Sequence, residues 1–236
     1  MRRRIKGLLL SILRPLFDEI YLRESRDIMR ARRFKAATEA ADYVDQHLPL
    51  APAFESRYEV YDYLIQTFKL NEQPGLVCEF GVAGGKSLNY LATRLPSHTL
   101  YGFDSFEGLP EDWRQGVLKG AFKQKRAPGV ASNVESVSGW FEDSLPPFLA
   151  DTPGDAVLLH IDCDLYSSTK TALQLLQPRL RPGSILVFDE FFNFPGWQAG
   201  EAQAFQEFAA ESGLAFEYLA FNMFGTQLVM RVVQRN

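Results

Sequence analysis

Cysteine is scarce in this sequence, and its scarcity excludes several classes of protein. The 236 residues contain two cysteines, Cys78 and Cys163, which form neither a zinc-ligand spacing nor a disulfide framework. Both fall in or just after apolar runs that resemble strands, so we expect a reduced, cytoplasmic compartment. A small secreted domain held together by disulfides is therefore excluded.

The sequence also lacks an excess of positive charge and a long apolar run. The net charge of -4 argues against nucleic acid as a partner. The opening MRRRIKGLLLSILRPLF has a basic start and an apolar stretch, but Arg14 and Pro15 interrupt it and no small-residue cleavage site follows. This stretch is too short to span a bilayer. We therefore expect neither a signal peptide nor a transmembrane helix here.

Positive charge is concentrated in the first part of the chain. Residues 1–35 contain 11 Lys/Arg and 4 Asp/Glu, a balance of +7, which leaves -11 for the remainder. Apolar residues fall at helical spacing at Ile5, Leu8, Leu9, Ile12, Leu13, Leu16 and Phe17. We predict a helical extension over residues 1–55 that packs on its own domain or on a second subunit of a homo-oligomer. The alternative is peripheral contact with an anionic membrane surface, which a basic amphipathic helix can make.

From residue 76 onward, short apolar strands alternate with helical segments. Seven strands are predicted, at 76–82, 98–104, 134–140, 156–162, 184–190, 214–222 and 227–233. Continuous apolar runs such as AVLL and SILVF indicate strands buried on both faces, hence a parallel α/β sheet covered by helices. The last two strands are joined by a connection too short for a crossover helix, so this pair should be antiparallel.

Helices are predicted around these strands from periodicity and capping signals. Ser56 is the expected N-cap of the helix SRYEVYDYLIQTFKL, and further helices are expected at KSLNYLATRL, SSTKTALQLLQPRL and AGEAQAFQEFAAES. The polar, glycine-bearing segment 110–133 predicts a long loop or lid. We therefore expect one α/β domain over residues 56–236.

Glycines and an acid mark the end of the first predicted strand. In CEFGVAGGKS, Gly81, Gly84 and Gly85 allow a tight turn and a close approach of the backbone to a ligand. The spacing matches neither the phosphate-binding G-x-x-x-x-G-K-S/T loop nor G-x-G-x-x-G. Glu79 puts negative charge where a dinucleotide pyrophosphate would lie, which suits a ligand with a cationic amino-acid end instead.

The next two strands also end in residues that suit a nucleoside. Asp104 ends the second strand, where a carboxylate can accept hydrogen bonds from both ribose hydroxyls. Trp140 and Phe141 follow the third strand and could stack on an adenine. The alternatives are a strand-end cap for Asp104 and ordinary core packing for the two aromatic residues.

Acidic residues end the fourth and fifth predicted strands. LLHIDCDLYSS contains Asp162 and Asp164, and SILVFDEFF contains Asp189 and Glu190. Because neighbouring parallel strands end at the same edge, Asp162, Asp189 and Glu190 should converge. With no basic residue expected nearby they would repel one another, and a hard divalent cation would remove that repulsion. Oxygen ligands favour Mg²⁺, with Ca²⁺ or Mn²⁺ as alternatives; a helix N-cap is the other interpretation for any single acid.

Five motifs in order resemble the macrocin O-methyltransferase family. They are EFGVAGGKS, GFDSFEGLPE, GWFEDSLP, HIDCDLYSST and FDEF, and the resemblance covers roughly residues 56–233. It implies the class I methyltransferase (Rossmann-like) fold, with a mostly parallel seven-stranded sheet whose last strand is antiparallel. It also implies an enzyme that transfers a methyl group from S-adenosyl-L-methionine, with the help of Mg²⁺, to a hydroxyl of a small-molecule or glycan acceptor. A sugar or glycoside is the first choice of acceptor and a catechol-like phenol the second.

The resemblance assigns a role to each candidate site residue. The cofactor would contact Glu79, Gly81, Gly85, Ser87, Asp104, Ser105, Gly139, Trp140, Phe141 and Asp162. The metal ligands would be Asp162, Asp189 and Glu190, the general base would be Asp164, and His160 is a candidate second base. Family members that act on antibiotic sugars usually have Asp-Asp after the fifth strand and Arg in place of His160. This chain has Asp-Glu and His, so its acceptor stays open.

Two other classes of protein compete with the enzyme. One is a non-catalytic protein of the same fold that binds a nucleoside, or a partner through its basic N-terminal helix. The intact set of acids argues against it. The other is a nicotinamide-dependent oxidoreductase, which conflicts with Glu79 and with the absence of G-x-G-x-x-G.

Overall fold

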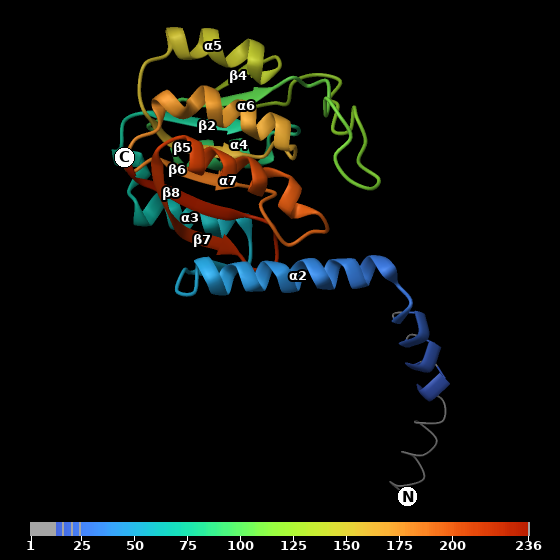
Figure 1. Cartoon of the computed structure of the whole chain (residues 1–236). Helices are drawn as coiled ribbons and strands as arrows, with labels where there is room; N and C mark the ends of the chain where they lie inside the picture. The colour runs from blue at the N-terminus through green and yellow to red at the C-terminus, as the bar shows by residue number, and fades with distance from the viewer. Residues whose placement is uncertain (1–12, 16, 20, 24, 236) are drawn as a thin grey trace, which may run out of the picture.

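The computed structural model describes residues 13–15, 17–19, 21–23 and 25–235, and an eight-stranded sheet forms its middle layer (Figure 1). The strands are β1 (Ala53–Phe54), β2 (Leu76–Phe80), β3 (Leu100–Asp104), β4 (Val134–Ser138), β5 (Ala156–Ile161), β6 (Ile185–Phe188), β7 (Leu214–Asn222) and β8 (Leu228–Arg235). All seven predicted strands are present. The eighth, β1, is an edge strand of two residues, too short to give a sequence pattern.

The sheet is parallel except for β8. The strand order is β1-β7-β8-β6-β5-β2-β3-β4, and β8 runs antiparallel to both of its neighbours, β6 and β7. This confirms the predicted topology with an antiparallel last strand. Every residue of the central strands β2, β5 and β6 is buried, as their continuous apolar runs indicate.

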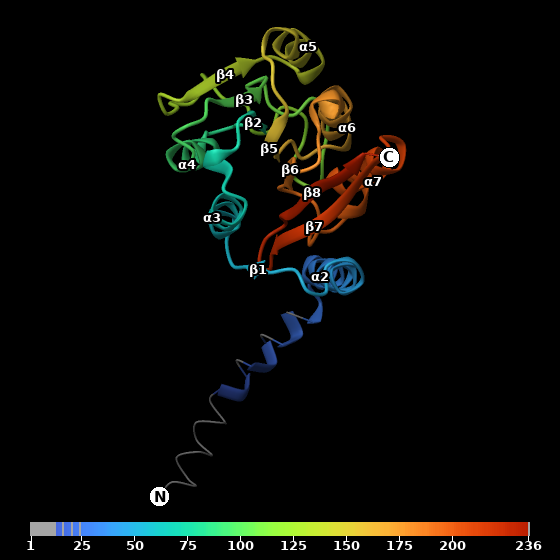
Figure 2. The ribbon, with the colours of Figure 1, turned by 90° about the vertical axis from the view of Figure 1, so that its left-hand side faces the viewer.

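Helices cover both faces of the sheet (Figure 2). One face carries α3 (Arg57–Thr67) and α4 (Lys86–Arg94), and the other carries α5 (Phe141–Asp151), α6 (Tyr166–Leu176) and α7 (Glu201–Glu211). Short 3₁₀ helices follow at η1 (Leu70–Glu72), η2 (Gln177–Arg179) and η3 (Trp197–Ala199). Sequence analysis did not predict α5, because Pro146 and Pro147 lie inside it and proline is unfavourable in a helix interior.

The start of α3 follows its sequence signal and fixes one side of the site. Ser56 is the N-cap: its side chain accepts a hydrogen bond from the Glu59 amide, while Glu59 Oε2 accepts one from the Ser56 amide. This capping box satisfies amide groups that the first turn leaves free. Arg57, in the same turn, is thereby held close to the carboxyl ends of the strands.

In the part of the extension that the structure describes, α2 (Ile28–His47) contacts the rest of the domain. Ala36 and Ala40 of α2 are buried, and the Tyr43 hydroxyl lies 2.6 Å from that of Tyr218 on β7. Towards the N-terminus the chain points away from the domain (Figure 1), and Phe17 is 62% and Tyr21 72% exposed. Much of the predicted amphipathic helix, residues 1–12, 16 and 20, lies outside the described residues.

Membrane and subunit contacts of the extension stay predictions. In the described part of the chain, no helix combines the length and the hydropathy needed to cross a bilayer.

Candidate active site

A cavity of about 460 Å³ opens at the carboxyl ends of the parallel strands. This is where open α/β sheets bind ligands. The predicted site residues that line it are Gly81, Asp104, Ser105, Gly139, Trp140, Phe141, Asp162, Asp164, Asp189 and Glu190. Sequence analysis therefore placed the acids and the nucleoside-binding candidates in one cavity, although they come from five different strand ends.

Gly81 brings the ends of β2 and β5 into direct contact. Its φ is 94°, and a Cβ atom at this position would lie 1.8 Å from the carbonyl oxygen of Asp162. Only glycine fits, because any side chain would collide with backbone that cannot move aside. The glycine predicted to allow close approach to a ligand thus also sets the distance between the nucleoside side of the cavity and the acids.

Asp104 organises the loops around the nucleoside side. Its Oδ2 accepts hydrogen bonds from the amides of Val82 (2.9 Å) and Ala83 (2.8 Å), and its Oδ1 accepts one from the Phe106 amide (2.7 Å). A carboxylate has about four lone-pair positions, so it retains capacity for a ribose hydroxyl. Asp104 therefore lines the cavity and also clamps the turns that follow β2 and β3.

Three predicted cofactor residues lie behind the cavity wall. Glu79 is fully buried: its Oε1 accepts a hydrogen bond from Ser87 Oγ at 2.9 Å, and its Oε2 lies 2.9 Å from His160 Nδ1. Gly85 caps α4 in a left-handed conformation and lies against Pro128. Both carboxylate oxygens of Glu79 are thus engaged by the protein itself, so the structure does not bring Glu79 to the cationic end of a ligand.

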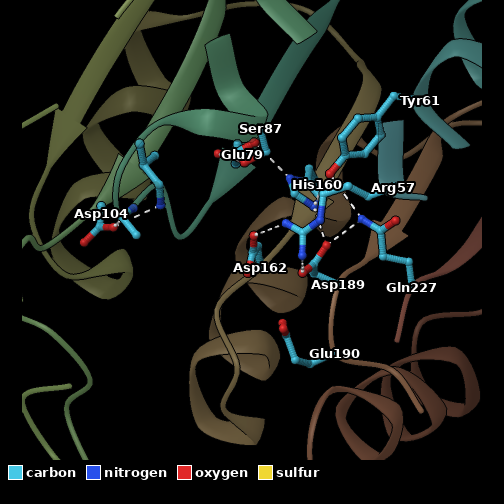
Figure 3. A network of polar contacts seen from close by, with 12 residues as sticks. Arg57, Tyr61, Glu79, Ser87, Asp104, His160, Asp162, Asp189, Glu190 and Gln227 are labelled. Carbon is cyan, nitrogen blue, oxygen red and sulfur yellow. Dashed lines mark hydrogen bonds and ion pairs between the residues drawn. The ribbon is translucent and has the colours of Figure 1, made fainter. Parts of the chain in front are cut away.

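His160 links Glu79 to the acids at the end of β6 (Figure 3). It is fully buried, and its Nε2 lies 3.4 Å from Asp189 Oδ1 and 3.1 Å from the Tyr61 hydroxyl. Burial alone would lower the pKa of His160, but hydrogen bonds to Asp189 and Glu79 raise it well above its usual value. With both ring nitrogens engaged inside the protein, His160 positions two carboxylates and does not face the cavity as a second base.

A basic residue accompanies the acids, which corrects the expectation that none would. Arg57 Nη2 donates to Asp189 Oδ2 at 2.7 Å, and its Nη1 lies 3.7 Å from Asp162 Oδ2 (Figure 3). Gln227 Nε2 donates to Asp189 Oδ1 at 2.5 Å. Burial would raise the pKa of Asp189, but hydrogen bonding to His160 and the charges of His160 and Arg57 lower it. Asp189 is therefore the best compensated acid of the cluster.

The other acids of the cluster are less well compensated than Asp189. Asp162, Asp164 and Glu190 each offer an oxygen, and these three atoms lie within 4.8 Å of one another. Burial raises the pKa of Asp164 to about 7, although Arg114 opposes this, and burial together with the charge of Asp162 raises the pKa of Glu190 well above its usual value. Among the described residues, Glu190 Oε2 is buried without a hydrogen-bond partner. An oxygen-only cluster with excess charge fits a hard divalent cation.

A further buried acid, Glu201, contacts the backbone of this cluster. Glu201, fully buried at the start of α7, accepts a hydrogen bond from the Glu190 amide at 3.0 Å, while its Oε1 has no partner within the described residues. Burial and the charge of Asp162 raise the pKa of Glu201 well above its usual value. Trp197, which precedes α7, is buried as well.

Sequence analysis did not name three further residues that line the cavity. Trp113, Arg114 and Phe122 line it from the segment 110–133, which has no helix and only one isolated bridge, Arg114 to Val117. The Arg114 guanidinium lies 3.8 Å from the centre of the Trp113 ring. The predicted lid thus does border the site, and its one tryptophan was the signal that could have identified it.

The glycine turn and the strand-end acids of the cavity lie within one segment that matches a known family, whereas Arg57 lies outside that segment. The sequence model of the methyltransferase domain family covers residues 78–191. The match covers just under half of the chain. It runs from β2 to the residues after β6, so it contains both the nucleoside side of the cavity and the acids.

Two curated relatives of this chain come from Streptomyces. The 8-demethyl-8-(2,3-dimethoxy-alpha-L-rhamnosyl)-tetracenomycin-C 4'-O-methyltransferase of Streptomyces olivaceus is 31% identical over 159 residues, 57% of this chain and 60% of the relative. The demethyldecarbamoylnovobiocin O-methyltransferase of Streptomyces niveus is 27% identical over 179 residues, 66% of each. The chain therefore spans just under two thirds of the length of these relatives.

Solved structures agree on the fold. A calicheamicin methyltransferase superposes with a TM-score of 0.57 at 24% identity, covering 87% of this chain and 93% of that one. A methyltransferase from the mycinamycin biosynthetic pathway, in complex with Mg and SAH, superposes with a TM-score of 0.51 at 13% identity, covering 74% and 48%. The fold is that of the class I methyltransferases, as the resemblance implied.

Proposed function

We propose that this chain is an S-adenosyl-L-methionine-dependent O-methyltransferase that uses a divalent cation and acts on a hydroxyl of a sugar or glycoside, like the macrocin O-methyltransferase family. One observation carries the proposal: Asp162, Asp164 and Glu190 converge beside the nucleoside side of the cavity of a methyltransferase domain. The names of both curated relatives describe O-methyltransferases, and one of them names a rhamnosyl compound, which supports this acceptor class.

The nucleoside side of the cavity fits S-adenosyl-L-methionine. When bound, this cofactor supplies a methyl group on a sulfonium, which an oxygen nucleophile can take. Asp104 would hold the ribose hydroxyls, since its carboxylate lines the cavity and is already oriented by three backbone amides. Trp140 and Phe141 line the cavity next to Gly139 and would border the adenine.

The acids fit Mg²⁺ because their donor atoms are all oxygens and one buried oxygen of Glu190 lacks a partner among the described residues. Asp162 and Glu190 would hold the ion, with Asp189 as the third predicted ligand. When bound, such an ion lowers the pKa of an alcohol and orients its oxygen.

Asp164 suits the role of general base. It lines the cavity, and its pKa of about 7 matches the task of taking a proton from a hydroxyl near neutral pH. Its φ of 63° is a left-handed conformation that aspartate tolerates better than most residues, and it turns the chain sharply after β5. The three acids thus divide into two that would hold the ion and one that would accept the proton.

A transfer assay tests the proposal. Labelled methyl transfer from S-adenosyl-L-methionine is measured over a panel of glycosides and catechols, with Mg²⁺ and with a chelator. We expect transfer to a sugar hydroxyl that stops on chelation and returns with Mg²⁺. Transfer that survives chelation contradicts the metal requirement, transfer to catechols alone replaces the acceptor class, and failure to bind the cofactor in calorimetry contradicts the enzyme.

A further inference from the structure

Arg57 occupies the space between two of the predicted metal ligands. Its guanidinium lies 2.7 Å from Asp189 Oδ2 and 3.7 Å from Asp162 Oδ2, and the three side chains meet on one wall of the cavity (Figure 3). A planar guanidinium and a divalent cation both satisfy carboxylate pairs, and they do so in the same space.

The Asp162–Asp189 pair needs a positive group beside it to remain charged. The Asp189 side chain is 1% exposed, whereas the Arg57 side chain is 39% exposed. A carboxylate buried to this degree is stable in its charged form only next to a positive group. Arg57 also approaches Asp162, the other carboxylate of the pair, at 3.7 Å.

Arg57 can leave without disturbing the helix that carries it. The backbone of its helical turn is held by the capping box of Ser56 and Glu59, and the carboxylate bonds involve only the tip of the side chain. That side chain already lines the open cavity. Rotation about its own bonds would therefore take the guanidinium away from the carboxylates at the cost of side-chain contacts alone.

We propose that Arg57 and the divalent cation are alternative occupants of the Asp162–Asp189 pair, which rests on the metal site of the proposed function. Arg57 neutralises the pair when the ion is absent, and the ion displaces it into the cavity when it binds. Arg57 thereby weakens metal binding, and Asp189 becomes a ligand only once Arg57 has moved.

Metal binding and thermal unfolding of Arg57 variants test this displacement. Mn²⁺ affinity is measured by electron paramagnetic resonance on the full chain, and unfolding is followed with and without Mg²⁺. The variants are Arg57→Gln, which removes the competing charge, and Arg57→Lys, which keeps the charge but not the fork that reaches two carboxylates. Arg94→Gln is the matched control, because Arg94 pairs with Asp62 at 2.5 Å and does not line the cavity.

We expect Arg57→Gln to bind Mn²⁺ roughly tenfold tighter or more, with Arg57→Lys between it and the wild type. Arg57→Gln should also unfold at a lower temperature without metal, and Mg²⁺ should restore most of that loss, whereas Arg94→Gln should show no extra response to Mg²⁺. Unchanged or weaker Mn²⁺ binding by both Arg57 variants overturns the displacement while leaving the metal site in place. No Mn²⁺ binding by the wild type or by either variant overturns the metal site of the proposed function as well.

Discussion

Replacing Asp104 by alanine should weaken the fold as well as the cofactor site. The structure shows three amides, of Val82, Ala83 and Phe106, that donate to this carboxylate. Each hydrogen bond to a charged group contributes about 1.5–3 kcal/mol, but the freed amides border the cavity and regain water. We therefore expect a net loss of about 2–4 kcal/mol in the free energy of unfolding, which is less than the three bonds would contribute if the amides stayed without water.

The melting temperature and the cofactor affinity separate the two roles of Asp104. A loss of this size should lower the melting temperature by roughly 5–15 °C in a chain of this length. Binding of S-adenosyl-L-methionine, measured by calorimetry well below the melting temperature, should weaken by about 1.5–3 kcal/mol for the lost ribose contact. Asp104→Asn keeps one acceptor oxygen and should show about half of the thermal loss.

The control for Asp104 is Asp151→Ala, at the exposed end of α5, which should change neither quantity. An unchanged melting temperature for Asp104→Ala would refute the argument that its amide bonds hold the two turns. An unchanged affinity would remove Asp104 from the ribose.

Four further predictions concern the acids and the N-terminal extension. Asp162→Asn should weaken Mg²⁺ binding, so that raised Mg²⁺ partly restores turnover. Asp164→Asn should leave metal affinity nearly unchanged and cut turnover by roughly 10²–10⁴-fold. This loss of turnover should become smaller as pH rises and should not change when metal is added. If Asp164→Asn loses metal binding instead, Asp164 is the metal ligand and Asp162 the general base. In metal-free buffer the melting temperature should rise as pH falls from 8 to 6. The reason is that the folded state binds more protons than the unfolded chain in this pH range. The pKa of Asp164 is about 7, and the pKa values of Asp162, Glu190 and Glu201 are also raised. A melting temperature that does not change with pH in scanning fluorimetry contradicts this. Deleting residues 1–20 should lower the melting temperature or dissociate an oligomer if they pack against protein, whereas loss of binding to anionic vesicles with unchanged melting would assign them to a membrane surface.

The strands were predictable because parallel strands buried on both faces must be apolar throughout. β5 and β6 read as AVLLHI and ILVF, with no polar residue but His160, so pattern alone identified them. The helix α5 was missed because its two prolines oppose helix formation locally, while packing of Leu145 in the core compensates. The two residues of β1 carry no pattern at all, and only pairing with β7 defines them.

The acids of the site were predictable and their partners were not. Topology alone brings the residues after β5 and β6 to one edge. The expected trio was Asp162, Asp189 and Glu190, whereas the three oxygens within 4.8 Å of one another belong to Asp162, Asp164 and Glu190. Arg57 lies 132 residues before the aspartate that it contacts and Gln227 38 residues after it, on separate elements. No local motif encodes such contacts. For the same reason the sequence could not reveal that Glu79, inside β2, turns inward to Ser87 and His160.

Glu201 and its neighbours have a consequence for protein engineering. Several acids buried around one cavity repel one another, so neutral substitutions there should make the empty protein more heat-resistant. A library selected only for survival at high temperature would therefore accumulate changes such as Glu201→Gln or Asp164→Asn, and with them the loss of the residues that we assign to the chemistry. Such a selection needs a second round on ligand binding, because at this cluster the substitutions that raise heat resistance also weaken the site.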